Sequence, residues 1–191
     1  MSIVVIFMKY QQIILIGISF FFAIQLTLAT AYAQVASSSS QTAQSTVDYQ
    51  LPYPGLLPDN PLYFLKMFRD NLTSFFLSKP LDKAQFELMQ SDKDTEASYL
   101  LVTQQAGKTD LALKTFSQGQ DDFTQAIVQV IDAKKQGYSI IEMSKKLDLS
   151  NQKHEQILRL IEQQMGQNDS GTFQIEHNRI ETFTKEIKAL H

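Results

Sequence analysis

The side chains best suited to chemistry in this sequence are three histidines, His154, His177 and His191. His154-Glu155 and Glu176-His177 lie on separate expected helices, and these residue types bind zinc where they meet in a bundle. Neither helix supplies a second ligand three or four residues further along, the spacing that places two ligands on one helix face. We therefore expect surface histidines, with no metal site.

Acidic residues form two further clusters. The segment 92–96 has the spacing that opens a calcium-binding loop, but Ala97 and Thr103 occupy the positions that require glycine and glutamate. We interpret this segment as a solvated helix face. Asp121 and Asp122 are adjacent in sequence, so on a helix their carboxylates diverge instead of facing a common site.

The motifs of the common enzyme classes are absent from the sequence. It contains no Gly-x-Ser-x-Gly elbow, no phosphate-cradling glycine loop and no dinucleotide fingerprint. A hydrolase or transferase needs a nucleophile, a base or a metal held in fixed geometry, and no such set is visible. We expect a protein that is not an enzyme, with no catalytic residue and no cofactor.

Residues 139–165 resemble a helix-turn-helix. Ser139 and Glu142 have the spacing of a capping box that starts a short helix over about 140–148, and Ser150 suits the cap of a second helix over about 151–165. DNA binding needs strong phosphate contacts, whereas the chain is acidic and its N-terminus indicates export. We expect two packed helices and no nucleic acid partner, and DNA binding is a remote alternative.

The elements that must position these residues are all expected to be helices. Four of the five prolines lie before residue 62 and the fifth is Pro80, so the rest of the chain is free of the strongest helix breaker. No strand pattern occurs. The fold class predicted is all-α, a bundle of five or six helices, over about 61–77, 80–105, 109–135, 140–148, 151–165 and 172–189.

Three of these helices carry informative patterns. Ten of the sixteen residues from Leu62 to Leu77 are apolar or aromatic, which predicts a helix at the centre of the bundle or one that touches something outside it. Helix 80–105 has a face interrupted by Lys93, which predicts a peripheral position. Gly119 within helix 109–135 predicts a close helix crossing or a kink. The expected inner faces are Phe86, Met89, Lys93, Ala97, Leu100 and Gln104 for helix 80–105, and Phe116, Phe123, Ile127, Val130 and Ile131 for helix 109–135.

The N-terminus indicates export. Residues 13–24 are strongly apolar, Lys9 precedes them, and Ala31-Tyr32-Ala33 fits the site that signal peptidase cuts. We predict a signal peptide over 1–33, a mature N-terminus at Gln34 and translation starting at Met8. An uncleaved membrane anchor is the alternative, because residues 13–33 could just span a bilayer.

Composition limits the partners. The chain has 17 basic and 20 acidic residues, and removal of residues 1–33 takes away Lys9 alone, so the mature net charge is −4. Bulk charge therefore disfavours polyanion binding. The chain has no cysteine, which excludes disulfides and thiolate metal sites.

Two segments connect the export signal to the helices. Residues 34–50 are polar and almost uncharged, which predicts a flexible linker. Residues 51–66 are rich in proline and apolar residues and open a helical domain over 51–191. Asn60 suits the cap of the first helix and Pro61 its first position. We expect Leu51, Tyr53, Leu56 and Leu57 to pack on the helical body.

Segment 51–66 resembles the hallmark of an uncharacterised family known as domain of unknown function 5667. The resemblance covers about residues 50–106 and implies an exported helical domain, without a known activity or catalytic residue. The motif residues that carry it are Pro54, Gly55, Leu57, Pro58, Asn60, Pro61 and Tyr63.

Two classes of function follow. The first is a non-catalytic exported helical domain with an interaction or structural role at the cell envelope, whose partner is an unknown protein or envelope component. It is secreted, periplasmic or at the cell surface, and it meets the membrane only through an uncleaved N-terminal segment. The alternative is an extracytoplasmic protein that binds a small ligand or metal, with Tyr53, Tyr63 and Tyr99 as contacts beside the histidines.

Overall fold

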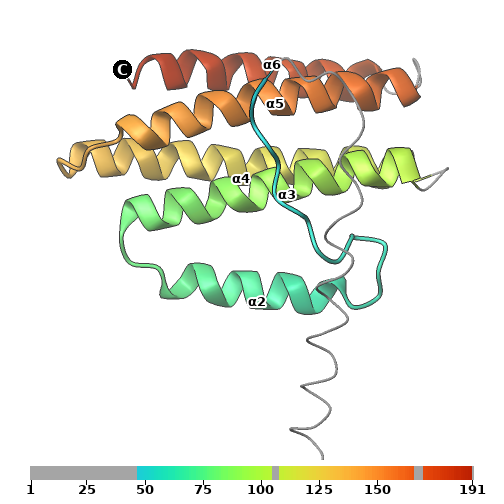
Figure 1. Cartoon of the computed structure of the whole chain (residues 1–191), viewed down its shortest axis with the longest axis horizontal. Coiled ribbons are helices and arrows are strands. Elements are labelled where there is room, and N and C mark those ends of the chain that lie inside the picture. Colours follow the sequence, from blue (N-terminus) through green and yellow to red (C-terminus); the bar gives the residue numbers. More distant parts are fainter. Residues whose placement is uncertain (1–46, 105–107, 166–169, 191) are drawn as a thin grey trace, which may run out of the picture. The chain divides into compact units, whose positions relative to one another are not determined.

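The computed structural model describes residues 47–104, 108–165 and 170–190. The described ranges are all-α, as the sequence predicts, with five helices and no strand (Figure 1). All five belong to one compact unit, Ser45–His191. The predicted cleavage site at Ala31, Ala33 and Gln34 lies outside the described residues. The helices are α2 (Tyr63–Phe76), α3 (Pro80–Gln104), α4 (Thr109–Lys135), α5 (Ile141–Met165) and α6 (Ser170–Lys188).

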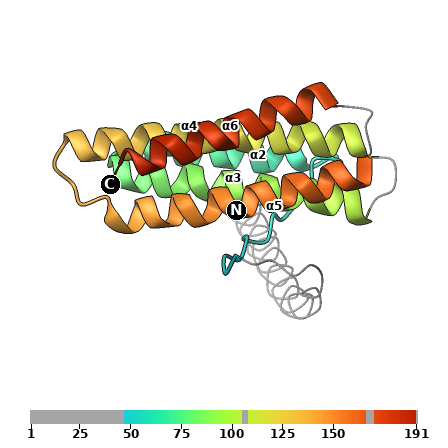
Figure 2. The ribbon, with the colours of Figure 1, turned by 90° about the horizontal axis from the view of Figure 1, so that it is seen from above.

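Helices α3 to α6 form a four-helix group, and α3 packs most closely on α4 (Figures 1 and 2). The close approach depends on Gly119 of α4. A Cβ atom there would lie 3.0 Å from the carbonyl oxygen of Ser91 and 3.2 Å from the Cβ of Asp94, both on α3. The close crossing predicted at Gly119 is therefore confirmed.

The interior holds two apolar clusters along the length of the bundle. The first core cluster gathers large side chains such as Leu88, Phe123 and Phe183, and the second gathers Phe116 and Phe173 among others. The predicted face of α4 is buried except at Ile131, which is partly buried. Buried polar residues lie between the two clusters at mid-bundle.

Two predictions about the helices are wrong. Residues 141–165 form one uninterrupted helix, so the two helices expected over about 140–148 and 151–165 are one, and the resemblance to a helix-turn-helix at 139–165 lacks its turn. Ser150 lies inside α5 and is fully buried, so it is not a cap. Helix α3 is central instead of peripheral, and of its expected inner face only Ala97 is fully buried. Apart from two leucines, its buried face consists of small and polar side chains, which give little hydrophobic contrast in sequence: Ala84, Leu88, Ser91, Asp92, Thr95, Ala97, Ser98 and Leu101.

The lead-in to α2 follows the bundle and is attached at several points. Leu51 and Pro54 are buried, and the carboxylate of Asp59 accepts a 2.6 Å hydrogen bond from Lys108. Gly55 has a φ of 76°, a left-handed conformation that glycine adopts without strain. Tyr53 is 77% exposed and Leu56 40% exposed, so these two do not pack on the body as expected.

The motif residues nearest α2 form a turn. The side-chain oxygen of Asn60 accepts a hydrogen bond from the backbone N–H of Leu62 at 2.9 Å, and the helix begins at Tyr63. The N-cap residue is therefore Leu62, two residues after the expected Asn60. Pro61 lies before the helix and not at its first position. Leu57 and Pro58 are partly buried in the same turn.

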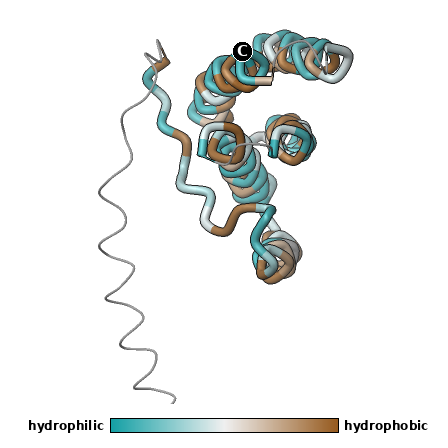
Figure 3. The backbone as a smooth tube through the Cα atoms, turned by 90° about the vertical axis from the view of Figure 1, so that its right-hand side faces the viewer, coloured by the Kyte–Doolittle hydropathy of each residue, from teal (hydrophilic) through white to brown (hydrophobic). Residues whose placement is uncertain are grey.

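Helix α2 is peripheral, so the first of the two predicted alternatives, a central position, is wrong, and the second, a helix that touches something outside the bundle, stays a prediction. It lies beside α3 at the edge of the four-helix group (Figure 3). None of the helices in the described part of the chain has the length and apolar character needed to traverse a bilayer.

Candidate functional site

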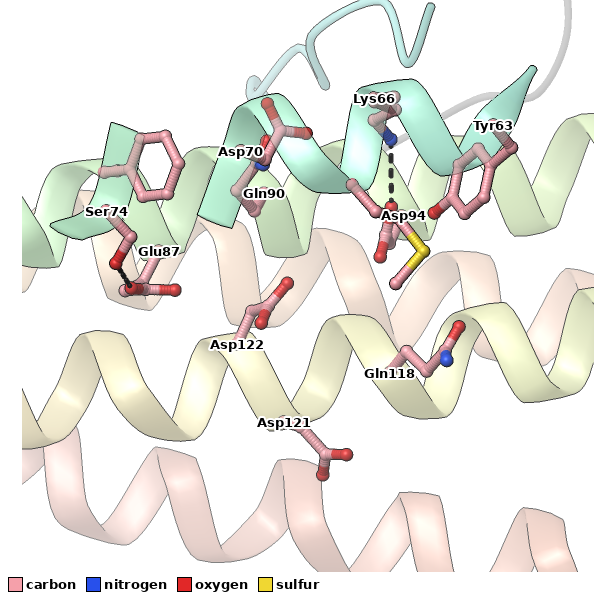
Figure 4. A pocket seen from close by; sticks show the side chains of 12 residues that line it. Tyr63, Lys66, Asp70, Ser74, Glu87, Gln90, Asp94, Gln118, Asp121 and Asp122 are labelled. Carbon is pink, nitrogen blue, oxygen red and sulfur yellow. Dashed lines mark hydrogen bonds and ion pairs between the residues drawn. The ribbon is translucent and has the colours of Figure 1, made fainter. Parts of the chain in front are cut away.

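Helix α2 turns its polar side chains toward the bundle. Tyr63, Lys66, Asp70 and Ser74 recur every three or four residues, so they share one helix face. This face lines a cleft against α3 and α4 (Figure 4). The ammonium of the buried Lys66 lies 3.4 Å from a carboxylate oxygen of Asp94, and the hydroxyl of Ser74 donates to Glu87 at 3.3 Å. Polar contacts therefore hold α2 in place.

The opposite face of α2 is apolar and exposed. We call it the outward face, and its members are Phe64, Leu65, Phe68, Leu72, Phe75 and Phe76, which are between 49% and 82% exposed. An amphipathic helix at a protein surface ordinarily buries its apolar stripe and exposes its polar one. Helix α2 does the reverse. At about 200 Å² for a phenylalanine side chain, the exposures amount to roughly 700 Å² of apolar surface.

The cleft beneath α2 has a volume of about 300 Å³ and an acidic lining. Five carboxyl groups and one ammonium group, that of Lys66, line it. The carboxyl groups are those of Asp70, Glu87, Asp94, Asp121 and Asp122. Asp121 also bonds Arg179 of α6 at 2.7 Å and its side chain is 73% exposed, so it points away from Asp122, although both residues line the cleft.

Burial and mutual repulsion raise the pKa of the inner carboxyl groups. The pKa of Asp122 is raised from 3.8 to about 7, first by burial and then by the negative charges of Asp94 and Glu87, with Lys66 opposing. Burial also raises the pKa of Asp94, against the effect of Lys66, and that of Glu87, against the hydrogen bond from Ser74. The cleft therefore exchanges protons near neutral pH and becomes more negative as the pH rises.

A second polar cluster, which the sequence did not reveal, lies at mid-bundle, and we call it the polar layer. The buried carboxylate of Asp92 accepts hydrogen bonds from Tyr49 at 2.5 Å and from Ser150 at 2.5 Å. The Nε2 atom of His154 lies 2.9 Å from the same carboxylate, and its Nδ1 lies 3.3 Å from the side-chain nitrogen of Gln120. Because the Gln120 amide can only donate at that nitrogen, Nε2 carries the proton given to Asp92.

The identities of Asp92, Ser150 and His154 match a catalytic triad, but their geometry does not. In a triad the acid and the nucleophile bond different nitrogens of the imidazole. Here Ser150 and Asp92 both lie beside Nε2, at 3.2 and 2.9 Å. All three side chains are buried, and the imidazole packs between Phe116 and Phe123 of the two core clusters. This polar layer therefore joins the clusters, and a substrate could not reach it.

The two histidines in the described part of the chain, His154 and His177, do not converge. His154 is fully buried, so the expectation of a surface histidine is wrong there. His177 is partly exposed and lies 3.2 Å from Glu162, and His191 is outside the described residues. The described residues contain no group of three or more histidine or acidic side chains arranged to hold a metal ion.

Comparisons with family models, with curated proteins and with solved structures find no match for this chain. The resemblance of segment 51–66 to an uncharacterised family therefore stays a prediction.

Proposed function

We propose that this protein is a non-catalytic, exported helical module that acts by contact at the cell envelope, with the outward face of α2 as its contact surface. The proposal of export rests on the sequence of residues 1–33, which has the charge, apolar run and cleavage site of a signal peptide.

The observation that carries the proposal is the reversed orientation of α2. Apolar patches on monomeric proteins rarely exceed about 300–600 Å², and larger ones tend to mark interaction sites. The outward face reaches roughly 700 Å² on one helix. Four of its six residues are phenylalanines, which provide large contact areas.

Ligand binding has less support from the described residues. Tyr53, Tyr63 and Tyr99 lie in different surroundings: Tyr53 is exposed, Tyr63 lines the acidic cleft, and Tyr99 packs against the second core cluster. The three tyrosines therefore do not line a common pocket.

Site-specific photocrosslinking in the producing cells tests the proposal. A photoreactive phenylalanine analogue at Phe75, which is 82% exposed, is expected to form a covalent adduct on irradiation. The matched control places the analogue at Ile175, an apolar residue of α6 that is 59% exposed. An adduct at position 75 and none at 175 supports the proposal, whereas no adduct at 75, or equal labelling at both positions, refutes it.

A further inference from the structure

We propose that the outward face of α2 is covered by the same face of a second copy of this chain. This inference rests on the proposed function, since it identifies the partner of that contact surface. Its support comes from the area of the face, the spacing of its residues and the position of the nearby charges.

The area of the face fits a two-fold interface. Stable protein–protein interfaces bury about 800 Å² on each partner. The outward face offers roughly 700 Å² of apolar surface, to which the flanking Leu62, itself 52% exposed, adds. A two-fold axis brings identical patches together, so one such face suffices for both copies.

The spacing of the face fits a helix as its partner. Leu65, Phe68, Leu72 and Phe75 follow one another at steps of three, four and three residues. Apolar residues with this alternating spacing form the seam along which two helices pack side by side. The seam extends over about two heptads, and the 14 residues of α2 span about 21 Å, enough for a lateral helix contact.

The charges favour a second copy over an anionic lipid surface. The carboxylates of Glu87, Asp94 and Asp122 lie behind α2, about one helix diameter of 10–12 Å from the apolar face. Against an anionic bilayer they would face headgroup charges at about the 8–10 Å Debye length. In the paired arrangement two helices separate the acidic clusters of the two copies, and repulsion across that distance is screened.

The absence of cysteine from the chain permits a direct test. In the full chain with Leu72→Cys, mild oxidation in the producing cells is expected to give a disulfide-linked dimer, because Leu72 lies near the middle of the seam. Ile175→Cys on α6 is the control for random collision. Light scattering of the exported protein is expected to give twice the chain mass, and Phe68→Glu to give the monomer. Circular dichroism checks that this variant, altered at a residue 68% exposed, remains folded.

The results separate this inference from the proposed function. If Leu72→Cys forms no more dimer than Ile175→Cys, or the exported protein is monomeric across a dilution series, the pairing of copies is refuted. An adduct at Phe75 with a lipid or with a different protein would then leave the contact function standing. If Phe75 gives no adduct of any kind, both proposals fail together.

Discussion

Replacing Asp122 by asparagine is expected to stabilise the protein at pH 8 and to leave its stability nearly unchanged at pH 3, below the pKa of the unfolded chain. The folded protein holds the Asp122 proton up to a pKa of about 7, whereas the unfolded chain loses it near 3.8. Since the folded state binds the extra proton between these values, Asp122 lowers stability as the pH rises through that window. Asparagine keeps the shape of the side chain and removes the charge.

The size of the effect follows from the pKa. A rise from 3.8 to about 7 corresponds, at about 1.4 kcal/mol for each pKa unit, to an upper limit of about 4 kcal/mol above pH 7. Part of this arises from Asp94 and Glu87, which can themselves take up a proton when Asp122 is charged. We therefore expect the variant to gain about 2–4 kcal/mol at pH 8.

Urea unfolding of the wild-type and variant chains at both pH values measures this difference. Asp110→Asn is the control on the same helix. Asp110 is exposed in the first turn of α4, where a carboxylate stabilises the helix end slightly, so its loss should not stabilise at either pH. An equal gain for Asp122→Asn at pH 3 and pH 8, or no gain at pH 8, would refute the buried acidic cleft.

Three further outcomes are expected. His154→Ala should lower the free energy of unfolding by about 1.5–3 kcal/mol in urea titrations, because the buried carboxylate of Asp92 would lose the hydrogen bond donated by Nε2; a change below about 1 kcal/mol, the net value of one ordinary hydrogen bond, would contradict the polar layer. Gly119→Ala should lower thermal stability by about 1–3 kcal/mol through overlap with α3, whereas Gly171→Ala on α6, with no neighbour within 4 Å, should not; equal effects would contradict the close crossing. Intact mass of the exported protein should place its N-terminus at Gln34, and a product that retains residues 8–33 would indicate an anchor.

The helices were predictable where large apolar residues recur at helical spacing. The spacing of Phe116 and Phe123 predicted the inner face of α4, and both side chains are fully buried. The prediction of the inner face of α3 failed because most of its buried residues, such as Ala84, Asp92 and Ser98, are small or polar. A helix packed this closely on Gly119 needs small side chains, and small side chains give no hydrophobic periodicity.

The polar layer was not predictable because its partners are distant in sequence. Ser150 follows a Leu-Asp-Leu run and looks locally like a helix cap, yet its hydroxyl donates to Asp92, 58 residues away. Long-range pairing of this kind overrides the local signal. The polar face of α2 was readable, since Tyr63, Lys66, Asp70 and Ser74 are regularly spaced. Hydrophobic content alone left a central helix and an outward contact as alternatives, because it does not tell which face of the helix points inward.

The direction of the apolar face of α2 follows from what lies beneath the helix. A half-turn of α2 would bury roughly 700 Å² of apolar surface, which at 25 cal/mol for each Å² corresponds to at most about 18 kcal/mol. It would also press phenylalanines onto Glu87, Asp94 and Asp122, each of which would lose solvent at several kcal/mol, and would break the ion pair of Lys66 with Asp94. The acidic cleft thus opposes burial of the apolar face within the same chain. A partner that covers this face from outside meets no carboxylate and gains the apolar burial, so the cleft both orients α2 and keeps its outward face available for contact.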